Sequence, residues 1–141
     1  MLRVIDTTVF EDKQALVVED DAHNLLALGS LLRDFKIQFK RNTTGANVLQ
    51  QARKHRPDFI LLDMDLPSGD PFAIRERLRD DRDLRDVPII AIGDSRVIKD
   101  LLPRIHASGF AGYLAKPIPQ QCLEDVLRTV FVGDWPNQRP S

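Results

Sequence analysis

Apolar residues along the chain gather into short runs that alternate with segments of helical period. Four of the runs are mostly apolar, which is typical of short strands covered on both faces in a parallel sheet. A fifth segment, 36–41, alternates apolar and polar residues, so we expect it to be an edge strand. The four apolar runs are 15–18, 59–62, 88–92 and 110–115.

Apolar residues at helical spacing predict a helix after each strand. Asp21 precedes the first helix and is expected to cap it, and Thr43 or Thr44 is expected to cap the second. Pro103 should kink or shorten the fourth helix. Cys122 is expected to pack as a small hydrophobe on the face of the last helix.

Five alternations of strand and helix predict an α/β fold, because right-handed crossovers wind such a chain into a doubly wound parallel sheet. We expect the flavodoxin-like strand order 2-1-3-4-5. The 141 residues suffice for one such domain. We expect residues 1–13 to form an N-terminal extension, 14–132 the domain and 133–141 a flexible tail that holds Trp135.

Charged residues follow three of the predicted strands directly. Glu19 and Asp20 end the first strand, Asp63 the third and Lys116 the fifth. In the expected strand order these ends surround one crevice, where carboxylates about 4 Å apart repel each other by roughly 4 kcal/mol at an effective dielectric of 20. A Mg²⁺ ion would relieve that repulsion, and Asp63 would then be able to accept a phosphoryl group. Two structural alternatives stay open, a capping role for Asp63 and a salt-bridge cluster.

Three motifs in these positions resemble one protein family. LVVEDD at 16–21, LLDMDLP at 61–67 and GYLAKP at 112–117 are similar, in order and spacing, to the receiver domain of two-component response regulators. The resemblance covers about 14–132. KPIP at 116–119 and the lack of room for an output domain in these 141 residues resemble the stand-alone members of the family.

The resemblance implies a role for each charged residue at the predicted site. Asp63 is the phosphoacceptor, and Lys116 contacts the phosphoryl group. Asp20, Asp63 and the backbone carbonyl of Asp65 coordinate Mg²⁺, while Glu19 holds the metal through water. Every one of these positions carries the matching residue type in this chain.

The resemblance also names the residues of a conformational switch, and here the chain departs from the pattern. Family members place Thr or Ser at the end of the fourth strand, whereas this chain has Gly93, followed by Asp94. Ser95 or the Gly93 backbone N–H would have to replace the missing hydroxyl. Tyr113 matches the aromatic residue that reports the switch, although a half-buried strand aromatic is an equal interpretation. The peptide bond before Pro117 is expected to be cis.

Partners follow from the resemblance and from the charge. We expect a histidine kinase or histidine phosphotransfer protein as phosphoryl donor, and a downstream protein at the last two helices and the fifth strand. With 20 basic and 21 acidic residues the formal charge is -1, so we expect neither nucleic acid nor membrane as a partner. A cytoplasmic location and a monomer or weak homodimer complete the expectation.

The main expectation is a signalling module that is phosphorylated and is not an enzyme. Two other functions are alternatives to it. Asp63-Met64-Asp65 matches the DxD pair of haloacid dehalogenase phosphatases, but the pair lies on the third strand and Pro67 stands where that family has Thr or Val. The alternative favoured by Gly93 and Asp94 is a pseudo-receiver, which acts as a docking or dimerisation domain without phosphorylation. Dinucleotide binding is not expected, because no glycine-rich turn follows the first strand.

Overall fold

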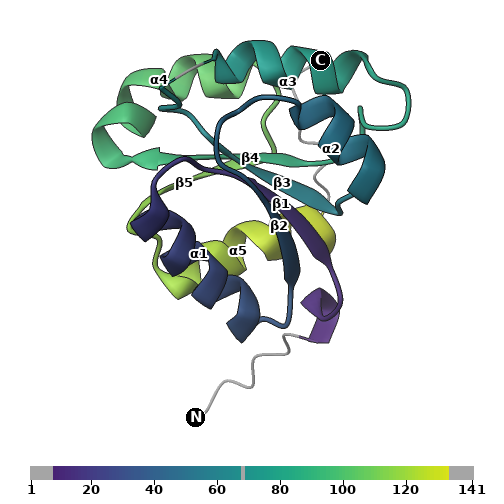
Figure 1. Ribbon diagram of the computed structural model, residues 1–141. Coiled ribbons are helices and arrows are strands. Elements are labelled where there is room, and N and C mark those ends of the chain that lie inside the picture. Colours follow the sequence, from purple (N-terminus) through teal and green to yellow (C-terminus); the bar gives the residue numbers. More distant parts are fainter. Residues whose placement is uncertain (1–7, 68, 134–141) are drawn as a thin grey trace.

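A computed structural model of the chain describes residues 8–67 and 69–133. Its centre is one parallel sheet of five strands in the order β2-β1-β3-β4-β5, which confirms the predicted topology (Figure 1). Every crossover is therefore a helix that returns the chain to the same end of the sheet. The strands are β1 (Gln14–Val18), β2 (Gln38–Asn42), β3 (Phe59–Asp63), β4 (Ile89–Asp94) and β5 (Gly112–Lys116).

Helices cover both faces of the sheet. On one face lie α1 and α5, and on the other lie α2, α3 and α4 (Figure 1). The two faces hold separate apolar cores because successive residues of each strand point in opposite directions. The helices are α1 (Ala22–Asp34), α2 (Val48–His55), α3 (Pro71–Asp80), α4 (Ser95–Ala107) and α5 (Gln120–Phe131).

The central strand β3 is buried along its whole length. It pairs with β1 on one side and with β4 on the other, so that Leu61 lies opposite Val17 and Ile90. The strand ends on Asp63, as its apolar run predicts. Asp63 therefore lies at the carboxyl edge of the sheet, where it is buried.

Helix caps agree with the sequence at α1 and disagree at α2. The Asp21 side chain accepts a hydrogen bond from the Asn24 backbone N–H at 2.9 Å, so Asp21 caps α1 as predicted. The prediction that Thr43 or Thr44 caps α2 is wrong, because α2 begins one turn later, after Asn47. The buried Asn42 side chain instead accepts the Thr44 N–H, at 3.2 Å, and holds this segment in a turn.

Pro103 does not have one of its two expected effects, and Cys122 does not lie where the sequence predicts. Pro103 does not shorten α4, which runs unbroken past it. Both Pro103 and Lys99, one turn earlier, are exposed, so the carbonyl group that lacks an N–H partner is on the solvent side of the helix. Cys122 is exposed rather than packed, because the buried face of α5 is formed by Leu123, Leu127 and other residues.

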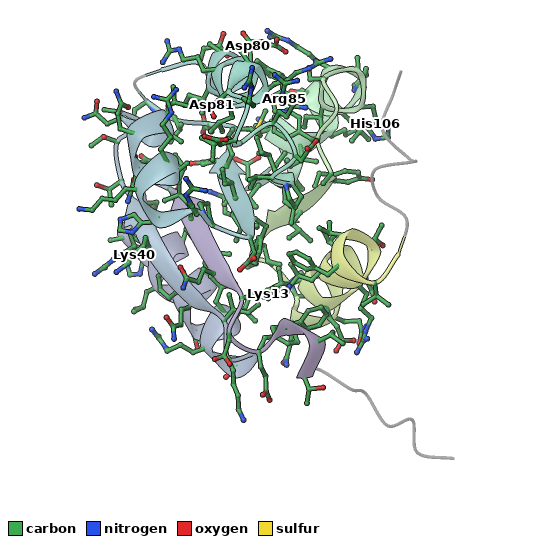
Figure 2. The ribbon with its side chains drawn as sticks, turned by 90° about the vertical axis from the view of Figure 1, so that its right-hand side faces the viewer. Lys13, Lys40, Asp80, Asp81, Arg85 and His106 are labelled. Atoms are coloured by element: carbon green, nitrogen blue, oxygen red, sulfur yellow. The ribbon has the colours of Figure 1, made fainter. Side chains whose placement is uncertain are left out.

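One acidic residue of the charged segment 80–86 is buried. Figure 2 shows Asp80, Asp81 and Arg85 at one end of the molecule. The Asp81 side chain is buried, and the Arg53 Nε–H of α2 donates a hydrogen bond to it at 2.7 Å. Asp81 thus joins the end of α3 to α2.

Part of the expected N-terminal extension packs into the domain. The 3₁₀ helix η1 (Thr8–Phe10) places Phe10 in the core between α1 and α5, with its ring edge-on to that of Phe35 at 5.7 Å. Trp135 and the rest of the expected tail beyond Gly133 lie outside the described residues. Among the described helices, none combines the length and the apolar character needed to cross a lipid bilayer.

Candidate functional site

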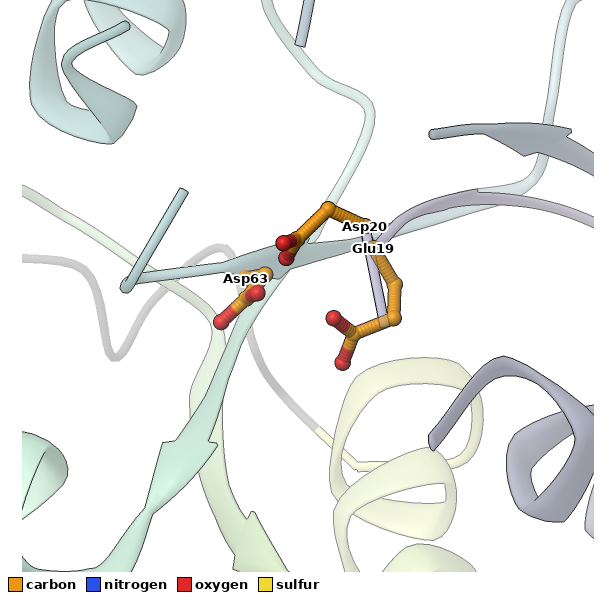
Figure 3. A group of neighbouring side chains, drawn as sticks. All are labelled: Glu19, Asp20 and Asp63. Atoms are coloured by element: carbon orange, nitrogen blue, oxygen red, sulfur yellow. The ribbon is translucent and has the colours of Figure 1, made fainter. Parts of the chain in front are cut away.

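Three strand ends bring charged side chains together at the carboxyl edge of the sheet. Glu19 and Asp20 follow β1, and Asp63 ends the neighbouring strand β3. One carboxylate oxygen from each of the three lies within 4.8 Å of the other two (Figure 3). Lys116, the last residue of β5, reaches the same cluster. The sequence predicted this convergence from strand order alone.

Glu19 is held from two sides. It has no exposed surface. Its Oε1 accepts a hydrogen bond from Lys116 Nζ, and its Oε2 accepts one from the Asp21 backbone N–H at 3.1 Å. The same Lys116 Nζ lies 3.5 Å from Asp63 Oδ1. A single ammonium group therefore bridges the carboxylates of β1 and β3.

The electrostatics of Asp63 reflect its burial. Only 2% of its surface is exposed. Desolvation and the neighbouring Glu19 raise the pKa of Asp63 to about 7, against the lowering effects of the Asp65 N–H and of Lys116. Burial alone would lower the pKa of Lys116, but the hydrogen bond from Lys116 to Glu19 and the charge of Asp63 outweigh burial, so this pKa is raised. The site thus keeps its ammonium charged and carries more negative charge than Lys116 neutralises.

The donor set suits a hard divalent cation. Asp20 is exposed and Asp63 is buried, so their oxygens offer a site that is open to water on one side. One or two carboxylates plus water are the ligands that Mg²⁺ prefers. Burial and the neighbouring Glu19 disfavour the ionised form of Asp63, and a bound cation would stabilise that form. Asp65 contributes no oxygen to the cluster of three carboxylates, and its backbone N–H donates to Asp63 Oδ1 at 3.1 Å.

The end of β4 lies beside this cluster and carries the residues expected to switch. Gly93 is buried, and Asp94 caps α4 by accepting the Val97 N–H at 2.9 Å. Sequence analysis missed this role for Asp94, although an acid directly before a run of helical period is the usual cap signal. Ser95 is exposed at the first position of α4.

Tyr113 lies in β5, and Pro117 follows the last residue of this strand. Tyr113 is 42% exposed, and its ring centroid lies 5.9 Å from that of His106 on α4. This exposure is compatible with both interpretations of Tyr113, the half-buried strand aromatic and the residue that reports the switch. The Lys116–Pro117 peptide bond is cis.

A groove beside Lys116 could not be predicted from the sequence. It has a volume of about 350 Å³ and lies between α1 and the loop that follows β5. Its walls include Ala27, Leu31 and Ile118. Because these residues are distant in sequence, only the packing of α1 against the loop reveals the groove.

Comparison with known proteins agrees with this geometry. The family model of the response regulator receiver domain matches residues 15–128. The polar-differentiation response regulators DivK of Brucella anthropi and Brucella ovis are 31% and 30% identical to the chain over 122 residues, covering 86% of it and 98% of each relative.

Solved structures agree as well. A putative response regulator from Chloroflexus aurantiacus superposes with a TM-score of 0.77 and 26% identity, covering 86% of this chain and 99% of its own. The receiver domain of a sensor histidine kinase from Pseudomonas aeruginosa has a TM-score of 0.76 and 27% identity, covering 87% and 99%. That structure is described with a magnesium ion coordinated in the active-site cleft. The chain therefore belongs to the receiver-domain family of two-component response regulators and is a signalling protein.

Proposed function

We propose that Asp63 accepts a phosphoryl group from the phosphohistidine of a kinase or phosphotransfer protein. A carboxylate oxygen of Asp63 forms a bond to phosphorus while the bond from phosphorus to the donor imidazole breaks, and the electron pair of that bond stays on the imidazole nitrogen. The observation that carries the proposal is the buried Asp63 carboxylate, which lies within 4.8 Å of the Glu19 and Asp20 oxygens and 3.5 Å from Lys116.

The other charged residues handle the charge that the transfer brings in. Asp20 and Asp63, with the Asp65 backbone carbonyl, would hold Mg²⁺, and Glu19 would support it through water. When bound, the metal would neutralise the negative charge of the phosphoryl oxygens. Lys116 would exchange its contact with Asp63 for a phosphoryl oxygen while it keeps the hydrogen bond to Glu19. The Asp65 N–H fixes the rotation of the Asp63 carboxylate.

The donor protein would dock at the groove beside Lys116. The walls of this groove are largely apolar side chains of α1 and of the loop after β5. A donor helix seated there would bring its histidine to the carboxyl edge of the sheet, next to Asp63. We propose that the exchange takes place in the cytoplasm and that the unit responsible spans residues 14–132.

The output would pass through α4, β5 and α5. Phosphorylation adds about -1.5 to -2 charge at the end of β3. With no hydroxyl at Gly93 and with the Asp94 carboxylate engaged as a cap, the Gly93 N–H or Ser95 is the group left to meet the phosphoryl oxygen. A downstream partner would then read the surface around Tyr113. The homodimer, if one forms, would be weak.

Phosphorylation by acetyl phosphate tests the proposal directly. Intact-protein mass spectrometry should show one added phosphoryl group on the wild type in the presence of Mg²⁺, and none after EDTA. The Asp63→Asn variant should add none. Asp83→Asn, a change of an exposed carboxylate in another loop, is the matched control and should be phosphorylated like the wild type. An unmodified wild-type protein, or an adduct that persists in Asp63→Asn, contradicts the proposal.

A docking module that never takes a phosphoryl group is not favoured over this function. The family match and the cluster of three carboxylates around Lys116 support the phosphoacceptor instead. The departure at Gly93 concerns how the modified state is read. It leaves the acidic cluster and Lys116 unchanged.

A further inference from the structure

A second groove runs along the opposite side of α1 from the groove beside Lys116. It has a volume of about 290 Å³ and lies between α1 and β2, which is an edge strand of the sheet (Figure 1). Neither the acidic cluster nor Lys116 takes part in it. The residues that line it are Ala22, Leu25, Leu26, Gly29, Arg33, Phe39 and Arg41.

The floor of this α1–β2 groove depends on a glycine. A Cβ atom at Gly29 would lie 2.8 Å from Phe39 Cζ, closer than real contacts allow. Gly29 therefore lets the partly buried Phe39 ring lie directly against the α1 backbone. The Arg33 side chain comes from the next turn, and its Nη1 is 3.5 Å from the same Cβ position. An aromatic ring and a guanidinium group thus both lie next to Gly29 in the groove.

The rim of the α1–β2 groove is apolar and unusually exposed. Leu26 has 69% of its surface exposed, the largest fraction among the exposed large hydrophobic residues described. A leucine in this position contributes nothing to the core of the protein. Apolar residues next to aromatic and arginine side chains are typical of the centre of protein interfaces.

The charges in the α1–β2 groove have one sign. Arg33 and Arg41 both line it, and among the described residues that line it none is acidic. No ion pair joins either arginine to a carboxylate within the described part of the chain. Since the chain as a whole carries a formal charge of -1, this is a local basic patch and not a general attraction to polyanions.

We propose that the α1–β2 groove is a docking site for a partner-protein segment in which an apolar side chain is flanked by carboxylates. The apolar side chain packs between Leu26 and Phe39, and the carboxylates pair with Arg33 and Arg41. Charge complementarity selects this occupant over a basic segment. The site is separate from the phosphoacceptor and does not depend on phosphorylation of Asp63.

Peptide titration of the full chain tests the proposal. Two short synthetic peptides carry the same central Leu-Phe pair, flanked by Glu in one and by Lys in the other. We expect the Glu peptide to shift the amide resonances of Leu26, Gly29 and Arg41 and to bind about tenfold more tightly than the Lys peptide, as two charge-assisted contacts allow. Equal binding of the two peptides, or shifts confined to another surface, overturns the proposal.

Charge reversal in the protein sharpens the test. Arg33→Glu combined with Arg41→Glu should invert the preference, so that the Lys peptide binds more tightly. Arg82→Glu, an exposed arginine in another loop, is the matched control and should keep the wild-type preference. A preference that does not change in the double variant contradicts the assignment of the two arginines.

A third variant avoids any dependence on the folding of the double variant. Leu26→Glu changes an exposed side chain, so its melting temperature should match the wild type, while its affinity for the Glu peptide should fall about tenfold. Unchanged affinity overturns the proposal. Shifts at the groove that grow with protein concentration in the absence of peptide would identify a second copy of the chain as the occupant and would also overturn it.

Discussion

Burial of Asp63 among other carboxylates has a consequence for stability as a function of pH. The folded protein raises the pKa of Asp63 from 3.8 to about 7, so between these values the folded state holds a proton that the unfolded state has lost. Stability therefore falls as pH rises through this interval. Asp63→Asn removes the penalty. We expect the variant to be more stable than the wild type at pH 8, by about 2 to 4 kcal/mol, with the difference vanishing near pH 4.

Urea denaturation at several pH values, in the presence of EDTA, measures this difference. The control is Asp83→Asn, which removes an exposed carboxylate and should show no such trend. Mg²⁺ should reduce the advantage of Asp63→Asn, since a cation favours ionised Asp63 in the wild type. An advantage of equal size at pH 4 and pH 8 would show that ionisation of the buried Asp63 is not its cause.

Residue chemistry was predictable where the residues lie at strand ends. The four charged residues of the site follow apolar runs in the sequence. Because the strands are parallel, these residues all lie at the same edge of the sheet: Glu19, Asp20, Asp63 and Lys116. Cys122 was placed wrongly on a packed face. The helical period of α5 allows a residue at the border of its apolar face, such as Cys122, to be either buried or exposed. Only tertiary packing decides between the two.

Among the elements, helix α4 depends on Asp94 as its N-terminal cap. Asp94 is one of the residues at the end of β4 that differ from the family pattern. The Asp94 carboxylate accepts the Val97 N–H at 2.9 Å. Asp94→Ala leaves this N–H without its partner and should cost about 1 kcal/mol in the free energy of unfolding. Asp94→Ser, which can also accept the bond, should retain most of the stability. Urea denaturation gives the free energies, and faster amide exchange at Val97 in the alanine variant would locate the loss in α4.

The link between α2 and the end of α3 should depend on pH in the opposite sense to Asp63. The hydrogen bond from Arg53 lowers the pKa of Asp81, so its contribution is present above the unfolded value of 3.8 and is lost as pH falls through the folded value. Arg53→Met should lower the urea midpoint at pH 7 and have little effect at pH 2. Lys54→Met, an exposed neighbour, is the control. An equal loss at both pH values would assign the effect to lost packing instead.

Element existence was predictable and element ends were less so. Period and apolar runs located all five strands and all five helices, because burial on one or two faces fixes those patterns. The start of α2 was missed because Asn42, a buried strand-end residue, binds the following turn through its side chain. The sequence left open whether Pro103 shortens α4, because that depends on whether the unpaired carbonyl group faces water.

For the whole molecule, the strand order could be predicted from the alternation of strands and helices and from the right-handed crossovers. The extent of the apolar core could not be predicted. Residues 8–13 show no sustained period, so nothing in the sequence marked Phe10 as buried. In the structure, the Arg128 guanidinium lies 5.5 Å above the Phe10 ring and Phe35 contacts its edge. Phe10 therefore closes the core between the ends of α1 and α5, outside the segment that carries the family motifs.

Removal of the Phe10 ring should weaken the whole fold. Phe10 has no exposed surface, and Phe10→Ala opens a cavity that the surrounding α1 and α5 side chains cannot fill. We expect a loss of about 3 to 5 kcal/mol in the free energy of unfolding, measured by urea denaturation. Val9→Ala, in the same turn but 40% exposed, should cost less than about 1 kcal/mol. Equal and small losses in the two variants would mean that η1 is held only loosely and that the domain ends at β1.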